Sequence, residues 1–288
     1  MRAIERLNPI ALTIYFLLVS GRVMFSNDPV LLCCSLMGAL ALHFALHGLT
    51  GWKTHGYTIA LFAVMALMNP IFNHNGATVL FVMNDNPVTL EACLYGLSAA
   101  GMIVAVLYWF RAFSFVMTSD KLLYVFGGIS PRLALLLSMT LRYVPLFGAQ
   151  ARKVSQAQKA LGLYKEDNIV DSFKAGLRVF SVMVTWTLEN GIITADSMTA
   201  RGYGTGRRSR YSLFRWRTED ALFLILSLVL CTLSAIFDRA VVYYPLLQIA
   251  PLTVRATIGY VAYGMLACMP VFICGKEAVK WHVLMYRM

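Results

Sequence analysis

The chain has 288 residues, of which 59% are hydrophobic and only 14% are charged, and its mean hydropathy is +0.66. An ordinary soluble domain carries about 25% charged residues, so this composition excludes that class and indicates a protein whose main solvent is lipid. The 25 lysine and arginine residues outnumber the 14 aspartate and glutamate residues, which gives a formal net charge of +11.

Apolar blocks recur along the sequence, and each is about as long as a helix that crosses a bilayer. Six membrane-spanning helices are predicted, at residues 10–24, 30–49, 57–72, 90–110, 221–237 and 257–273. The first block follows Arg2 and Arg6, but no small-residue cleavage site comes after it. We therefore expect a retained span and not a removed signal peptide.

The distribution of lysine and arginine predicts which loops face the cytoplasm, because cytoplasmic loops are enriched in these residues. Basic residues occur before the first span, between the second and third, throughout 111–217, and after the last span, whereas the loop 73–89 has none. An even number of spans then places both termini in the cytoplasm. The organisation expected is 1–110 with four spans, a cytoplasmic region 111–217, and 218–288 with two spans.

Residues 111–217 carry 16 of the 25 basic residues and 6 of the 14 acidic ones, so this region holds +10 of the net charge. It also has helical patterns. Apolar or small residues recur every three or four positions along one face from Leu177 to Gly202, which predicts a long amphipathic helix and not a span. A second helical stretch starts apolar near Leu133 and becomes polar after Pro145.

Small residues spaced four apart occur in both of these stretches. Gly191, Ala195 and Thr199 form one set, and Ala151 and Ser155 form the other. Such spacing lets a second helix backbone approach closely, so a crossing of two long helices is predicted there. The alternative is that the small residues merely fill the surface of each helix.

Few motifs in the sequence indicate chemistry. The chain has no glycine-rich phosphate loop ending in Gly-Lys-Ser or Gly-Lys-Thr, so we expect no ATP site and no cofactor of its own. His43 and His47 lie one helical turn apart, a spacing that can hold a metal, but interfacial hydrogen bonding explains them better. Glu91 at the start of the fourth span is explained by helix capping.

The most distinctive local feature is Met198-Thr199-Ala200-Arg201-Gly202-Tyr203-Gly204, at the predicted end of the long amphipathic helix. Gly202 is a typical stop after a helix. Arg201 could simply complement the negative end of the helix dipole. Alternatively, the helix presents one forked guanidinium to a groove on a partner protein, where paired hydrogen bonds would anchor it.

With these residues in view, the chain resembles the transmembrane T component of energy-coupling factor transporters, the CbiQ/EcfT-like family. That resemblance implies an all-α integral membrane protein with about six transmembrane helices and long amphipathic cytoplasmic coupling helices, in the bacterial inner membrane. It also implies two ATP-binding subunits and a substrate-capture membrane subunit as partners, alongside the lipid bilayer and without nucleic acid. The chain itself would be a non-catalytic coupler in vitamin or metal-ion uptake.

In this family each coupling helix ends in an Ala-Arg-Gly-like motif that docks on an ATP-binding subunit. Ala200, Arg201 and Gly202 resemble the second motif. The first is expected after Leu141-Arg142-Tyr143-Val144-Pro145, where Lys159, Ala160, Leu161 and Gly162 stand, so leucine replaces the arginine. Either Lys159 supplies the charge at that end, or the end docks through apolar contact.

Two other functional classes are considered from the residues. An intramembrane enzyme would use His43, His47, Glu91 or Asp196, which requires at least two of them in one water-accessible cavity. A stand-alone scaffold would bind anionic lipid or RNA through the basic and aromatic segment 207–217. Such a scaffold would be active without any ATP-binding subunit.

Overall fold

Helices make up nearly all of the structure, a computed structural model that describes residues 3–48, 52–83, 86–162, 169–206, 214–239, 241–249, 251 and 253–286. The chain divides into two compact units. Met1–Thr118 and Phe214–Met288 form the first unit, and Ser119–Leu213 form the second. The predicted cytoplasmic region 111–217 covers the second unit together with a few residues on either side.

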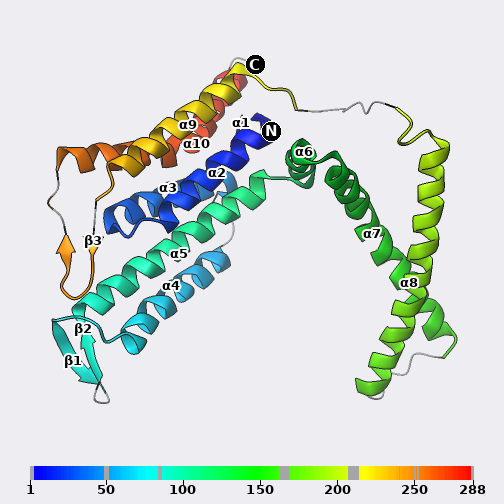
Figure 1. Cartoon of the computed structure of the whole chain (residues 1–288), viewed down its shortest axis with the longest axis horizontal. Helices are drawn as coiled ribbons and strands as arrows, with labels where there is room; N and C mark the ends of the chain where they lie inside the picture. The colour runs from blue at the N-terminus through cyan, green and yellow to red at the C-terminus, as the bar shows by residue number, and fades with distance from the viewer. Residues whose placement is uncertain are drawn as a thin grey trace. The chain divides into compact units, whose positions relative to one another are not determined.

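The first unit is a helical bundle with two short hairpins (Figure 1). Its elements are α1 (Ala3–Arg6), α2 (Pro9–Met24), α3 (Pro29–His47), α4 (Trp52–Phe72), β1 (Val79–Met83), β2 (Asn86–Thr89), α5 (Leu90–Val116), α9 (Thr218–Ile236), β3 (Val241–Val242), β4 (Gln248–Ile249) and α10 (Val254–Tyr286).

Two helices in this unit, α2 and α3, begin where a polar side chain caps the first turn and proline follows. The side chain of Asn8 accepts a hydrogen bond from the Ile10 amide at 3.0 Å, and Asp28 accepts one from the Val30 amide at the same distance. Pro9 and Pro29 occupy the first helical position, where the missing amide hydrogen costs nothing. The starts of α2 and α3 are therefore fixed by local sequence.

Six helices in the described residues are long and apolar enough to cross a membrane: Pro29–Leu46, His55–Phe72, Leu90–Val116, Pro131–Ala160, Thr218–Ile236 and Val254–Lys276. The predicted class of all-α integral membrane protein is thereby confirmed, and five of these helices coincide with predicted spans. The sixth, at Pro131–Ala160, lies in the region predicted to be cytoplasmic. It qualifies by length and composition, because its first half is apolar.

The predicted helix at residues 10–24 is present, whereas its crossing of the membrane stays a prediction. These residues form α2, a helix of 16 residues, which is about 24 Å long and shorter than a hydrocarbon core of about 30 Å. Its side chains are nevertheless central to the bundle. Tyr15 is fully buried, stacks edge-on against Trp109 and Phe16, and donates a hydrogen bond to the Leu266 carbonyl at 2.9 Å. The helix α2 therefore packs as a core element of the first unit.

Antiparallel hairpins connect helices in the first unit: β1 with β2 between α4 and α5, and β3 with β4 between α9 and α10. The amide of Ala77 donates to the carbonyl of Pro245 at 3.1 Å, so the two hairpin segments touch. The ring of Tyr95 on α5 lies 5.4 Å from the ring of Tyr243. These contacts hold the second hairpin segment against the beginning of α5.

The second unit consists of three helices, within the limits of the described residues. They are α6 (Ser119–Ile129), α7 (Pro131–Ala160) and α8 (Ile169–Ala200). Ser130-Pro131 starts α7 at the same cap and proline positions as the starts of α2 and α3, although Ser130 makes no side-chain cap bond. Few residues of this unit are buried, and Ala175 is the best-buried apolar residue among them.

Candidate functional site

The end of α8 is a hydrogen-bonded turn built around Gly202. Gly202 has a φ of 78°, in the left-handed region, and its amide bonds to the Thr199 carbonyl at 2.9 Å. The amide of Tyr203 bonds to the Met198 carbonyl, also at 2.9 Å. These two bonds make a Schellman motif, which satisfies the last carbonyls of the helix. The predicted role of Gly202 as the helix stop is confirmed.

Arg201 is the last residue before that left-handed glycine, and its side chain is exposed. In the described part of the chain, its guanidinium has no hydrogen-bond or ion-pair partner. A Thr205 hydroxyl bond to the Gly202 carbonyl, at 2.7 Å, braces the turn that follows. The guanidinium of Arg201 is therefore exposed on a turn that backbone and Thr205 hydrogen bonds hold in place.

The end of α7 repeats the same backbone. Gly162 has a φ of 70°, and its amide bonds to the Lys159 carbonyl at 3.0 Å, as the Gly202 amide bonds to the Thr199 carbonyl. Leu161 takes the position of Arg201 and is 73% exposed. Lys159 lies two positions before Leu161, as Thr199 lies two positions before Arg201. Leu161 is therefore the counterpart of the arginine in backbone geometry.

α7 and α8 cross (Figure 1), and polar and aromatic side chains join them. The Tyr143 hydroxyl lies 2.8 Å from the Thr194 hydroxyl, and the Phe147 ring packs edge-on against Trp186 with centroids 5.6 Å apart. Because Tyr143 pairs with a later residue of α8 than Phe147 does, the two helices run antiparallel. Tyr143 and Phe147 are four residues apart, a helical spacing from which this aromatic contact could have been anticipated.

The predicted crossing residues lie beside this contact. Gly191, Ala195 and Thr199 are on the exposed side of α8, whereas Ala151 and Ser155 on α7 are half-buried. A Cβ added at Gly191 would meet no other atom within 4 Å. In this arrangement the helices therefore meet through Thr194 and not through Gly191, and close approach at the small residues stays a prediction.

The apolar face predicted from Leu177 to Gly202 also points away from α7. Four of its large members are at least 41% exposed, namely Leu177, Phe180, Val184 and Leu188. The half-buried positions of α8 are instead residues such as Met183, Asn190 and Thr194. The helix α8 therefore presents an apolar stripe that the described residues of the second unit leave uncovered.

Two of the residues considered for an intramembrane enzyme, His43 and Glu91, lie apart within the first unit. The His43 ring lies 5.0 Å from the His55 ring and 5.6 Å from the Tyr108 ring, measured between centroids. Glu91 is 17 residues before Tyr108 on α5, about 25 Å along the helix, and bonds to Thr78. Asp196 belongs to the second unit. The His47 side chain and most of the segment 207–217 lie outside what the structure describes.

A metal centre was also considered. No group of three or more histidine, cysteine, aspartate or glutamate side chains that could hold a metal ion occurs within the described residues. The pair formed by His43 and His55 is instead a contact between α3 and α4, where the Nδ1 of His55 lies 2.8 Å from the Tyr108 hydroxyl.

Comparisons with known proteins match this chain to one family. A family model described as CbiQ, cobalt transport protein, matches residues 2–213. An energy-coupling factor transporter transmembrane protein EcfT of Streptococcus equi is 31% identical over 100 residues, which is 34% of this chain and 37% of that protein. The EcfT of Streptococcus thermophilus is 26% identical over 245 residues, which is 79% of this chain and 91% of that protein. The first of these alignments spans little more than a third of the relative's length.

Proposed function

Because the chain belongs to the CbiQ family of cobalt transport proteins, we propose that it is the coupling subunit of an energy-coupling factor importer. In this proposal two ATP-binding subunits dock on the ends of α7 and α8, and a separate membrane subunit captures a vitamin or a metal ion. ATP hydrolysis belongs to the docked subunits, and this chain transmits the resulting motion. Its place is the bacterial inner membrane, with both termini in the cytoplasm.

The observation that carries the proposal is the exposed guanidinium of Arg201, which has no hydrogen-bond or ion-pair partner among the described residues, on a hydrogen-bonded helix end. A guanidinium can form two parallel hydrogen bonds with one carboxylate, and such pairs anchor protein interfaces when a groove shields them from water. Because the Schellman turn already fixes the backbone, little conformational entropy is lost when the end docks. A groove with a carboxylate at its base is the partner that fits.

The end of α7 supports a second groove of different character. Leu161 sits on the same backbone turn as Arg201, and 73% of it is exposed. An exposed leucine gains about 1.5–3 kcal/mol when it becomes fully buried. Apolar docking through Leu161, with Ala160 and Gly162 beside it, therefore fits this end better than an ion pair through Lys159. Two grooves of different chemistry favour two different ATP-binding subunits.

Transmission of the motion would depend on the crossing of α7 and α8. The two helices are joined through the pairs formed by Tyr143 with Thr194 and Phe147 with Trp186, so a displacement of one helix end is passed to the other helix. Coupling of this kind requires two discrete arrangements of a packed element. Ala151, Ser155, Gly191, Ala195 and Thr199 would provide room for the second arrangement. The exposed apolar stripe of α8 is a surface for the membrane subunit that captures substrate.

The proposal is tested by co-expressing the full chain with the ATP-binding subunits of the host's energy-coupling factor transporters and isolating it from membranes. A stable complex that hydrolyses ATP is expected, while the chain alone should hydrolyse none. A chain that binds no ATP-binding subunit would contradict the coupler role. Binding of anionic vesicles or RNA by the chain alone would then favour the scaffold alternative.

A further inference from the structure

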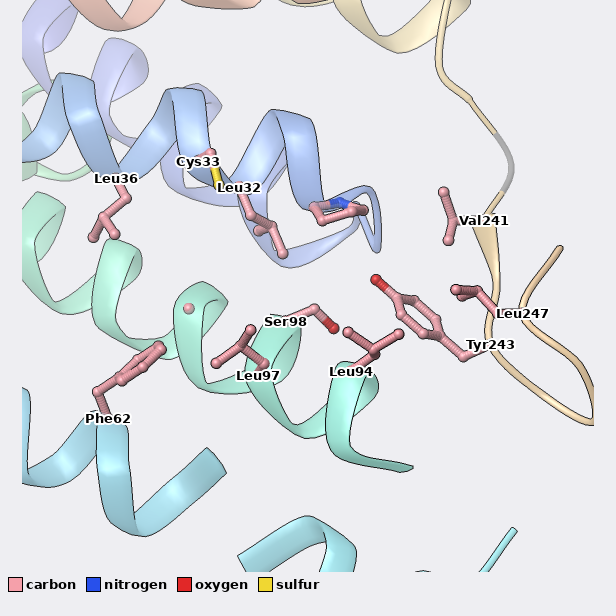
Figure 2. A pocket seen from close by; sticks show the side chains of 12 residues that line it. Leu32, Cys33, Leu36, Phe62, Leu94, Leu97, Ser98, Val241, Tyr243 and Leu247 are labelled. Atoms are coloured by element: carbon pink, nitrogen blue, oxygen red, sulfur yellow. The ribbon is translucent and has the colours of Figure 1, made fainter. Parts of the chain in front are cut away.

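An apolar groove lies on the first unit between α3 and α5 (Figure 2). Leu32 and Leu36 line it from α3, and Leu94 and Leu97 line it from α5. Phe62 of α4 reaches it from one side, and Tyr243 after β3 stands at the end where α3 and α5 begin. Its volume is about 290 Å³. An engineered apolar cavity of about 150 Å³ holds benzene, so this groove has room for a longer hydrocarbon.

The groove offers almost nothing to a polar ligand. Ser98 and Tyr243 are the hydroxyl-bearing side chains that line it, and each already donates a hydrogen bond inside the protein. Ser98 donates to the Tyr95 carbonyl at 2.9 Å, and Tyr243 donates to the Asn27 carbonyl at 2.8 Å. Burial raises the pKa of Tyr243, so its hydroxyl stays neutral. Ordered water, metal ions and polar substrates need partners that these side chains do not provide.

The groove runs along the helices and not across them. Its lining on α3 extends from Pro29 to Leu36, and its lining on α5 extends from Leu94 to Gly101. Seven residues of helix cover about 10 Å, which is roughly a third of a hydrocarbon core. Both helices are candidate spans, so the groove starts at one end of the spans and points into the bilayer. Acyl chains of lipids run in the same direction.

The groove is also open at the outer surface of the bundle, where lipid would lie if α3 and α5 cross the membrane. Cys33 is exposed on its rim, and Leu97 is 50% exposed. Gly101 forms part of the floor, and a Cβ placed there would meet no atom within 4 Å. The missing side chain at Gly101 therefore leaves the groove deep. No neighbouring atom lies close enough to require glycine at this position.

From these observations we propose that this groove holds one acyl chain of a membrane phospholipid. The chain would fill the space between α3 and α5 that the side chains of these helices leave open. A hydrocarbon chain matches the apolar lining, the direction and the opening to the bilayer. The inference is independent of ATPase docking, because every residue involved belongs to the first unit.

The test uses the full chain reconstituted in vesicles of phosphatidylethanolamine and phosphatidylglycerol. A phosphatidylcholine with a photoactivatable diazirine in its acyl chain is added as a minor component. After irradiation, mass spectrometry locates the lipid adducts. Leu107 provides the reference for ordinary lipid contact, because it is 43% exposed on the same helix and does not line the groove. We expect adducts at Leu36 and Leu97 to exceed those at Leu107 several-fold.

Gly101→Leu fills the groove and should lower the adducts at Leu36 and Leu97 several-fold, without changing those at Leu107. Gly264→Leu is the matched control, because Gly264 is another half-buried glycine in a span with no atom within 4 Å of its added Cβ. Gly101→Ala should have a smaller effect and is used if the leucine variant does not fold.

Two results would overturn the proposal: equal labelling of the groove residues and Leu107, or labelling of the groove residues that Gly101→Leu leaves unchanged. Labelling at Leu107 without labelling in the groove also overturns it, since protein would then cover the groove.

Discussion

At the ends of α7 and α8 the chain makes the same backbone turn twice, with leucine before the glycine at one end and arginine at the other. Gly162 and Gly202 have φ values of 70° and 78°, and each amide bonds to the carbonyl three residues earlier. The backbone of these ends is therefore set by glycine, whereas their chemistry is set by the residue before it. We expect substitutions of Leu161 and Arg201 to leave the turn unchanged, so the two ends can be compared by experiment.

Arg201→Ala should have the largest effect. Removal of a buried, paired guanidinium at an interface commonly costs 2 kcal/mol or more, which corresponds to a loss in affinity of about 30-fold. Affinity for the ATP-binding subunits, measured with the purified full chain in detergent, should fall by at least that factor. Arg152→Ala is the matched control, because Arg152 is also an exposed arginine on a long helix of this unit. Equal losses in both variants would mean that only net charge matters.

Leu161→Ala should weaken docking less, by about 1.5 kcal/mol or roughly tenfold, because only apolar burial is lost. Leu161→Met preserves most of the apolar surface and should stay close to wild type in the same binding assay. Leu161→Arg should weaken docking as well, since it places an unpaired charge in an apolar groove. Tighter binding by Leu161→Arg would show instead that both grooves prefer arginine.

Gly202→Ala should cost about 1 kcal/mol of stability at the end of α8, because alanine is strained in the left-handed region. Hydrogen exchange of the amides of Gly202 and Tyr203 would report the loosened turn. Gly191→Ala is the opposing control. Gly191 lies inside α8 with open space around it, so alanine there should stabilise the helix by about 0.8 kcal/mol. Destabilisation by Gly191→Ala would indicate the close helix approach predicted from sequence.

Tyr143→Phe should have the smallest effect, about 0.5 kcal/mol, because it removes one half-buried hydrogen bond and keeps the aromatic packing. Thermal unfolding of the full chain would measure it. Thr194→Val should cost more, because the Thr194 hydroxyl also donates a hydrogen bond to the Asn190 carbonyl at 2.7 Å. The double variant should cost no more than Thr194→Val alone, since that change already removes the bond to Tyr143. Additive effects would contradict a direct bond between these two hydroxyl groups.

Local features of the sequence predicted much of the fold. Apolar block length located five spans, and the pairs Asn8-Pro9 and Asp28-Pro29 mark helix starts that the structure shows. The helix α2 (Pro9–Met24) matches the predicted range 10–24. The hairpin of β1 and β2 was missed. Strand pairing depends on contacts between segments, and helical periodicity carries no information about it.

The candidate site was only partly accessible from sequence. Gly202 indicated the end of α8, and the motif around Arg201 directed attention to it. The equivalence of Leu161 with Arg201 was expected from the family resemblance, and the backbone geometry, in which Lys159 takes the place of Thr199, agrees with it. The contact between Tyr143 and Thr194 depends on how two long helices cross, which small-residue spacing alone did not locate.

The most direct test of the central claim is photo-crosslinking from the end of α8 in the assembled complex. p-Benzoylphenylalanine would replace the exposed Thr199, two residues before Arg201, and in a second variant the exposed Thr185 in the middle of the same helix. Docking through the helix end predicts a crosslink to an ATP-binding subunit from position 199 and none from position 185. An assembled complex that crosslinks equally from both positions, or only from position 185, would contradict it.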